Sequence, residues 1–201
     1  QRQMCIRDSA FIEHKDYTEV RQLQQNILDS YDRDFSKHAP IAEVPRIRMV
    51  WRSIPAQLAK DAKKFQYKLI KSGARTSQYG DAIDWLIRAG IVNKCMKCSQ
   101  GFYPVAAYQD VSAFKLYYSD LGIMSARLGM TLEALQGKET EHFRGILTEN
   151  YVAIALKTNG YDLYYWESDN RMRALRAFYC HESNCRCPIR IDRLCLLALC
   201  N

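Results

Sequence analysis

The chain has 201 residues, of which 48% are hydrophobic and 25% are charged, and its formal net charge is +7. This length suits one or two small domains with a buried core. The sequence has no run of about 18 apolar residues, so we expect no transmembrane helix. Its first residues lack the apolar stretch of a secretory signal, so we expect a cytoplasmic protein with free thiols and no membrane partner.

Charge and cysteine are both concentrated at the ends of the chain. Residues 1–9 contribute +1 and residues 171–201 contribute +4, which leaves +2 for residues 10–170. Because nonspecific affinity for a polyanion comes from neutralising phosphates, this nearly neutral body argues against strong nonspecific binding. Five of the eight cysteines lie in the last 22 residues: Cys180, Cys185, Cys187, Cys195 and Cys200.

Both ends differ in character from the body. Residues 1–9 include Met-Cys-Ile-Arg-Asp, which resembles the read-through translation of a sequencing adapter, so we interpret them as an adapter-like artefact. Residues 171–201 show no sustained period, which favours a reading-frame slip over a genuine cysteine-rich, metal-binding appendix. We expect such a tail to lack a sheet register and to leave the strand of Trp166 as an exposed edge.

The N-terminal part of the body predicts two helices. Apolar residues recur at spacings of three and four through residues 17–35, which is typical of an amphipathic helix. Pro45 can open a second helix, because proline is tolerated in a first turn, and Pro55 is expected to interrupt or restart it. The apolar stripe of this second helix consists of Ile47, Val50, Trp51 and Ile54.

The next elements are predicted to complete a winged-helix-like unit over residues 44–110. Alternating apolar residues predict a short strand at 65–70. Thr76 or Ser77 can cap a helix that Gly90 ends. A β-hairpin is predicted from strands at 91–95 and 102–107. Helix, helix, short strand, helix and hairpin is the order of a winged helix.

The remaining body predicts an alternation of strands and helices. The expected elements are a strand at 113–118, a short helix at 121–128, a further helix at 131–135, a long amphipathic helix at 141–158 and a strand at 161–167. The residues expected to be largely buried are Trp51, Leu86, Ile87, Phe114, Leu116, Phe143, Leu147, Tyr151 and Trp166.

Five segments, in order within residues 11–170, carry a family resemblance. They are Lys64 to Leu86 (KFQYKLIKSGARTSQYGDAIDWL), Ala89-Gly90-Ile91, Ala113 to Gly122 (AFKLYYSDLG), Phe143 to Val152 (FRGILTENYV) and Leu163 to Ser168 (LYYWES). With these segments the chain resembles the C-terminal domain of unknown function carried by predicted bacterial AAA ATPases. The resemblance implies a mixed α/β fold in which N-terminal helices and the winged-helix-like unit precede a truncated restriction-endonuclease-like α/β half.

The same resemblance sets the expected domain organisation and cofactors. Residues 10–43 would be a linker or lid helix from the ATPase half, and residues 111–170 an incomplete PD-(D/E)XK-like region. The chain contains no Gly-x-x-x-x-Gly-Lys-[Ser/Thr] phosphate loop. We therefore expect no cofactor in this fragment, with ATP and Mg²⁺ only in the missing ATPase half, which would be its first partner.

For catalysis, the resemblance carries over one acidic position, Glu149, on the first helix of the nuclease-like region. The family continues with Glu-[Val/Ile]-Asp-Phe and a Pro-Ile-Glu-Val-Lys-like strand, whereas this chain has residues 172–178 and Pro188 to Arg193 (PIRIDR) there. Mg²⁺ prefers several oxygen ligands, so a lone carboxylate does not form its site. We assign no catalytic residue, and favour a capping or hydrogen-bonding role for Glu149.

Cys95 and Cys98 have the spacing of half a zinc site. Structural zinc takes four ligands, and the second pair would have to come from Cys185 and Cys187 in the tail. The alternative, which we favour, is two incidental thiols in a hairpin turn. We therefore predict no metal site.

The densest basic run of the body is a candidate nucleic-acid-binding surface. It consists of Lys60, Lys63, Lys64, Lys68, Lys71 and Arg75. Such a run can contact a DNA backbone, and it can equally be a solvated surface or a face that docks the missing ATPase. The helix that follows carries Asp81 and Asp84 against the single Arg88, which does not suit a DNA recognition helix.

Three hypotheses of function follow. The favoured one is a non-catalytic regulatory or binding module of an AAA-family ATPase, which couples the ATPase to a DNA or protein partner. The alternative is the remnant of a Mg²⁺-dependent PD-(D/E)XK-type nuclease, inactive here because the strand acids are missing. A free-standing winged-helix regulator would need outward Lys or Arg on its recognition helix. We expect no enzymatic activity in this fragment.

Overall fold

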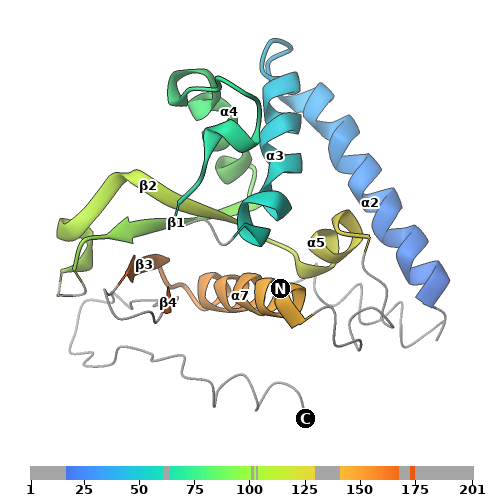
Figure 1. Cartoon of the computed structure of the whole chain (residues 1–201). Coiled ribbons are helices and arrows are strands. Elements are labelled where there is room, and N and C mark those ends of the chain that lie inside the picture. Colours follow the sequence, from blue (N-terminus) through green and yellow to red (C-terminus); the bar gives the residue numbers. More distant parts are fainter. Residues whose placement is uncertain are drawn as a thin grey trace.

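The computed structural model of the protein describes residues 17–60, 64–100, 102, 104–129, 141–167 and 173–174. These residues form a mixed α/β fold with helices on both sides of a small sheet (Figure 1), which confirms the expected fold class. The α-helices are α2 (Tyr17–His38), α3 (Val44–Ala59), α4 (Thr76–Arg88), α5 (Leu121–Arg127) and α7 (Glu141–Thr158). The strands are β1 (Val92–Cys98), β2 (Gln109–Tyr118), β3 (Tyr164–Glu167) and β4 (Arg173–Ala174).

Trp51 of α3 lies at the centre of the core, and the two predicted N-terminal helices are confirmed around it. Its ring is fully buried and meets Tyr31 and Phe35 of α2 edge-on, at centroid distances of 5.7 and 5.0 Å. Tyr118 of β2 makes a third edge contact at 6.0 Å. Edge-to-face aromatic pairs are favourable beyond the area they bury. These rings therefore join α2, α3 and the sheet into one core.

Pro55 was expected to interrupt or restart the second helix, and it does neither. It lies inside α3 and is buried. Proline has no N–H, so the carbonyl of Trp51, four residues earlier, loses its helical partner. The buried hydroxyl of Tyr118 donates to this carbonyl at 2.6 Å. A side chain from β2 thus replaces the missing backbone donor and connects α3 to the sheet.

The end of α4 follows its prediction, but the start does not. Gly90, with φ of 70°, follows the C-cap residue. Its N–H donates to the carbonyl of Ile87, and the N–H of Ile91 donates to the carbonyl of Leu86. This paired pattern is a Schellman motif, which needs a left-handed residue at the position of Gly90. At the start, the N-cap residue is Arg75 and not Thr76 or Ser77. The buried residues of α4 are Tyr79, Ala82, Ile83 and Leu86.

The described strands form a mixed sheet in the order β2-β1-β3-β4. β1 pairs antiparallel with β2 and parallel with β3. The register shifts within the first pair, because Met96 lies opposite Phe114 whereas Lys97 lies opposite Asp110. Residues 111–113 of β2 therefore bulge, and Val111 is 80% exposed.

The predicted strand at 65–70 is wrong. Phe65 makes a single backbone bond to β2 without forming a strand: its N–H donates to the carbonyl of Phe114 at 2.7 Å, and the two rings stack at 5.3 Å. The chain then forms a 3-10 helix, η1 (Tyr67–Leu69). The alternation that suggested a strand reflects the burial of Phe65 against Phe114, and no ladder of backbone bonds extends beyond it.

The predicted hairpin is also only half right. Its first strand is β1, but the return strand is β2 and not residues 102–107, which overlap the 3-10 helix η2 (Val105–Tyr108). Residues 109–112, the first of β2, are polar except for the exposed Val111, so nothing in the sequence indicated that the strand predicted at 113–118 begins earlier. β2 runs across the expected domain boundary at residue 110.

The predicted helices at 121–128 and 141–158 and the strand near 161–167 are confirmed as α5, α7 and β3. The expectations for residues 1–9 and 131–135 lie outside the described residues. In the tail, Arg173–Ala174 forms β4 and pairs antiparallel with β3 at Trp166 and Glu167. These two residues therefore do have a sheet register, and β4 covers the strand of Trp166 at Trp166 and Glu167.

The expected core is confirmed for five of its nine residues. Trp51, Leu86, Phe114, Leu116 and Leu147 are buried. The other four are only partly buried, at the margins of the core: Ile87, Phe143, Tyr151 and Trp166.

Candidate functional site

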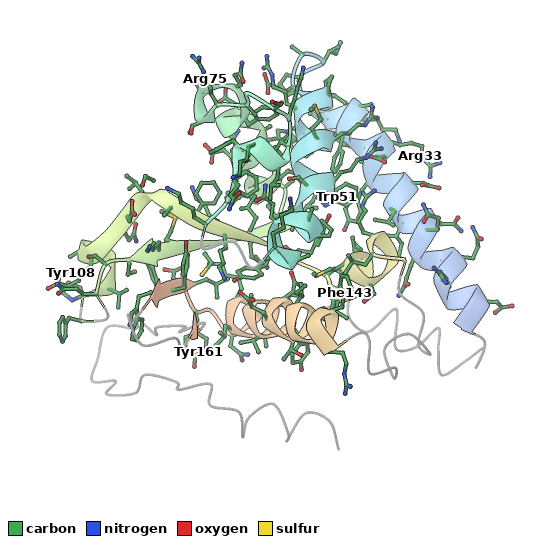
Figure 2. All side chains as sticks on the ribbon, viewed as in Figure 1. Arg33, Trp51, Arg75, Tyr108, Phe143 and Tyr161 are labelled. Carbon is green, nitrogen blue, oxygen red and sulfur yellow. The ribbon has the colours of Figure 1, made fainter. Side chains whose placement is uncertain are left out.

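The predicted basic residues lie on one exposed stretch between α3 and α4. Lys60 follows α3, Lys68 belongs to η1, and Lys71 and Arg75 precede α4. Figure 2 shows Arg75 at the end of the molecule away from α7. All of these described residues, and Lys64, are exposed, and none forms a salt bridge with another described residue. Lys63 lies outside the described residues.

A buried glutamine fixes this stretch to α3. The side-chain amide of Gln57 donates to the carbonyl of Gln66 at 2.8 Å, and its oxygen accepts from the N–H of the same residue at 2.9 Å. Gln57 is only 5% exposed, so both bonds are shielded from water and from competition with it. The basic stretch is therefore held in place although its lysine side chains are in solvent.

The stretch ends in a tight turn that needs its glycine. The N–H of Ala74 donates to the carbonyl of Lys71 at 3.1 Å, and Gly73 has φ of 76°. A positive φ at the third residue is the mark of a type II turn, where a side chain is strained. Gln78 then accepts from the N–H of Arg75 at 3.2 Å, which fixes the entry into α4.

A hollow of about 200 Å³ lies beside this turn. It brings together two cations from separate segments, Arg46 of α3 and Lys71 of the turn. The remaining lining residues are Ser72, Gly73, Ala74, Gln78 and Tyr79. Arg46, which is 25 residues away from Lys71 along the chain, was not among the residues predicted from the sequence. The one available signal was its exposed position on α3, directly before the buried Ile47.

Glu149 lies in a different place and is bonded to two side chains of β2. Lys115 Nζ is 2.9 Å from Glu149 Oε1, and the Tyr117 hydroxyl donates to the same oxygen at 2.6 Å. Burial, together with the neighbouring Glu149 carboxylate, raises the pKa of Tyr117 well above its usual value. The Lys115 ammonium also lies 5.3 Å from the centre of the Tyr165 ring. Glu149 thus neutralises the partly buried Lys115 and accepts a hydrogen bond from the buried Tyr117 hydroxyl.

The residue after Glu149 makes an even tighter connection. Asn150 is fully buried, and its side chain accepts from the N–H of Tyr118 at 2.9 Å and donates to the carbonyl of Tyr118 at 3.1 Å. Both backbone groups of the last residue of β2 are satisfied in this way. The pair Glu149-Asn150 therefore fastens α7 to β2. Of this pair, only Glu149 was predicted from the sequence to have a bonding role.

Cys95 and Cys98 lie on strand β1 and not in the hairpin turn where we expected them. Both are buried free thiols. Burial raises the pKa of the Cys98 thiol to about 11, and it raises the pKa of Cys95 further. The described residues contain no cluster of three or more residues suited to hold a metal, and Cys185 and Cys187 lie outside them.

The fold and its surface define a mixed α/β domain with an exposed basic stretch and an adjoining hollow. Residues 9–134 match the family described as Domain of unknown function (DUF8612), and because this is more than half of the chain, the protein belongs to that family. The matched range contains the basic stretch and the hollow, whereas α7 with Glu149 lies beyond it. The chain has no match among curated proteins or solved structures. Among the described residues, no helix is long and apolar enough to cross a membrane.

Proposed function

We propose that this domain is a non-catalytic binding module that couples an AAA-family ATPase in the cytoplasm to DNA. The observation that supports a nucleic-acid partner is the exposed basic stretch with Lys64, Lys68, Lys71 and Arg75, whose cations form no salt bridges with described residues. Exposed lysine and arginine side chains of this kind are able to contact the phosphates of a nucleic acid. The ATPase part of the proposal rests on the sequence resemblance.

The winged-helix-like reading of residues 44–110 supports the same partner. α3, α4 and the β1–β2 hairpin follow one another as in such a unit, although the 3-10 helix η1 takes the place of its short strand. The exposed positions of α4, however, include Asp81 and Asp84. We therefore propose a contact through the basic stretch and not through α4 in the major groove.

The surroundings of Glu149 favour a binding module over the remnant of a nuclease. A Mg²⁺ site would use the carboxylate oxygens of Glu149 as ligands. One of these oxygens already accepts from Tyr117 and pairs with Lys115. In this role Glu149 joins α7 to β2, which accounts for an acid at this position without a metal.

Binding of a short fluorescein-labelled DNA duplex, measured by fluorescence anisotropy, tests the proposal. We expect binding that weakens steeply between about 50 and about 200 mM salt, because each neutralised phosphate releases counterions. The variant Lys68→Glu/Arg75→Glu should weaken binding at least about tenfold. A matched charge reversal on α2, Arg33→Glu/Lys37→Glu, should have a much smaller effect. Absence of salt-dependent binding, or equal losses in the two variants, would contradict a DNA-binding role for this stretch.

A further inference from the structure

The hollow beside the Lys71–Ala74 turn differs from the rest of the basic surface, because it is concave. The hollow has a volume of about 200 Å³ and lies between α3, the Lys71–Ala74 turn and the N-terminal end of α4. Two exposed cations from different segments, Arg46 and Lys71, line it. Here two positive charges border the same small space, which is an arrangement that suits a compact anion.

We infer that this hollow is a phosphate-binding subsite, and that its natural occupant is a backbone phosphate of the nucleic acid; the identity of that occupant rests on the proposed function. A phosphate offers only acceptor oxygens, and the hollow offers the guanidinium of Arg46, the ammonium of Lys71 and the hydroxyl of Ser72. No carboxylate lines it. The ligand class is therefore an oxyanion and not a cation.

The neighbouring Glu43 carboxylate partly offsets the positive charge of Arg46, but it leaves Arg46 able to bind an anion. The Glu43 carboxylate forms an ion pair with Arg46 one turn earlier on α3. A guanidinium carries five N–H donors in a planar fork, so one carboxylate contact leaves other donors for a phosphate. The Glu43 contact also orients the Arg46 side chain, which lowers the entropy lost when an anion binds.

The turn provides a fixed frame for this subsite. Gly73 takes a conformation that other residues adopt only with strain, and the Ala74 N–H closes the turn onto Lys71. Behind it, the ring of Tyr79 is buried. Because the backbone at the hollow is held by these contacts, Lys71 is tethered close to Arg46 before any ligand binds.

The acidic side of α4 indicates how the nucleic acid approaches. Asp81 and Asp84 are exposed further along α4 and would repel phosphates placed alongside the helix. The hollow lies at the first turn of α4, where Gln78 and Tyr79 line it. We infer that the duplex backbone meets this end of the helix only. Phosphate contacts carry no sequence information, so binding should depend little on base sequence.

Another hollow, beside Glu149, differs from this one in size and lining. It has only about 10 Å³, roughly the space of one water molecule. It is lined by Lys64 and Lys115, but the carboxylate of Glu149 lines it as well. Its size and its acid do not suit a phosphate, which distinguishes it from the hollow of Arg46 and Lys71.

The first test measures DNA affinity against salt for the full chain and for Arg46→Gln/Lys71→Gln. We expect the double variant to bind about tenfold or more weakly, and the slope of log affinity against log salt to fall by about 1 for each lost phosphate contact. The control Arg33→Gln/Lys37→Gln removes the same charges from α2 and should leave the slope nearly unchanged. Equal losses in the two variants would mean that only overall charge matters, and would overturn the subsite.

The second test uses inorganic phosphate and does not depend on DNA. In amide ¹H–¹⁵N spectra at constant ionic strength, phosphate should shift the signals of Ser72, Gly73 and Ala74 in a saturable manner. Arg46→Gln/Lys71→Gln should abolish these shifts while the rest of its spectrum shows a folded protein. Phosphate binding without DNA binding would keep the subsite and refute the proposed partner. DNA binding that is insensitive to the double variant, with no phosphate shifts, would refute the subsite and keep the proposed function.

Discussion

The junction of α7 with β2 and the stretch between α3 and α4 use polar side chains in opposite ways. At the junction, Glu149 and Asn150 are each bonded to side-chain or backbone groups of β2, and Asn150 is completely buried. In the stretch, the cations of Lys68 and Lys71 are exposed and form no salt bridge with described residues. Polar groups that are satisfied inside the protein stabilise the fold, and cations left in solvent are available to a partner. Mutations should therefore affect stability at the first place and binding at the second.

The largest effect on stability is expected at Asn150. Asn150→Leu keeps a similar volume but removes both bonds to the backbone of Tyr118. Each buried backbone group left without a partner costs about 1–3 kcal/mol, so the free energy of unfolding should fall by about 2–6 kcal/mol. Urea denaturation followed by circular dichroism measures this. Arg144→Gln, at an exposed position of the same helix, is the control and should change stability little. A loss below about 1 kcal/mol for Asn150→Leu would show that α7 does not depend on this connection.

The apolar part of the same junction is tested by Leu147→Ala. Leu147 lies one turn before Tyr151 on α7 and is 8% exposed. Truncation of a buried leucine removes its transfer free energy and leaves a cavity, which together cost about 2–5 kcal/mol. The same denaturation experiment applies, with Val111→Ala as the control, because Val111 protrudes into solvent. A loss below about half a kcal/mol would place this face of α7 in solvent.

The sequence predicted the helices better than the strands, for reasons visible in particular residues. The helical stripes of α3 and α4 carry their periodicity locally, so Trp51 and Leu86 were correctly expected to be buried. The pairing of β1 with β3 joins residues far apart in the chain and has no local signature. The alternation around Phe65 reflects the burial of its side chain, but the chain forms the 3-10 helix η1 directly after it.

The candidate site could likewise be predicted only in part. The run of lysines from residue 60 to 71 was visible because its members are close in sequence. The contribution of Arg46 depends on how α3 packs beside the turn, which no local pattern reports. Glu149 was selected by resemblance, but its bonds to Lys115 and Tyr117 depend on the docking of α7 against β2. The hollow therefore exists only in the tertiary structure, which brings Arg46 of α3 beside Lys71 of the turn.

A smaller effect on stability is expected at the bond between the Tyr118 hydroxyl and the carbonyl of Trp51. Tyr118→Phe removes the donor that compensates for Pro55 and leaves this buried carbonyl without a partner, at a cost of about 1–3 kcal/mol. Pro55→Ala restores a backbone N–H at the position that normally bonds the same carbonyl. In the double variant Tyr118→Phe/Pro55→Ala, the loss should therefore be smaller than in Tyr118→Phe alone. Additive effects in this double-mutant cycle would disprove the compensation.

The smallest effect on stability should come from removing an exposed cation of the stretch between α3 and α4. This is the sharpest test of the difference between that stretch and the α7–β2 junction. Lys71→Gln removes a charge that is exposed and forms no salt bridge with described residues, so the free energy of unfolding should change by less than about 0.5 kcal/mol. The turn itself remains, because its bond from Ala74 uses only the backbone of Lys71. Gly73→Ala provides the matched perturbation of the same turn: there is open space around the added methyl group, but its positive φ disfavours alanine, so stability should fall by about 1 kcal/mol or more. A Lys71→Gln variant that is as destabilised as Gly73→Ala would mean that Lys71 supports the fold, and the stretch would then lose its distinction from the α7–β2 junction.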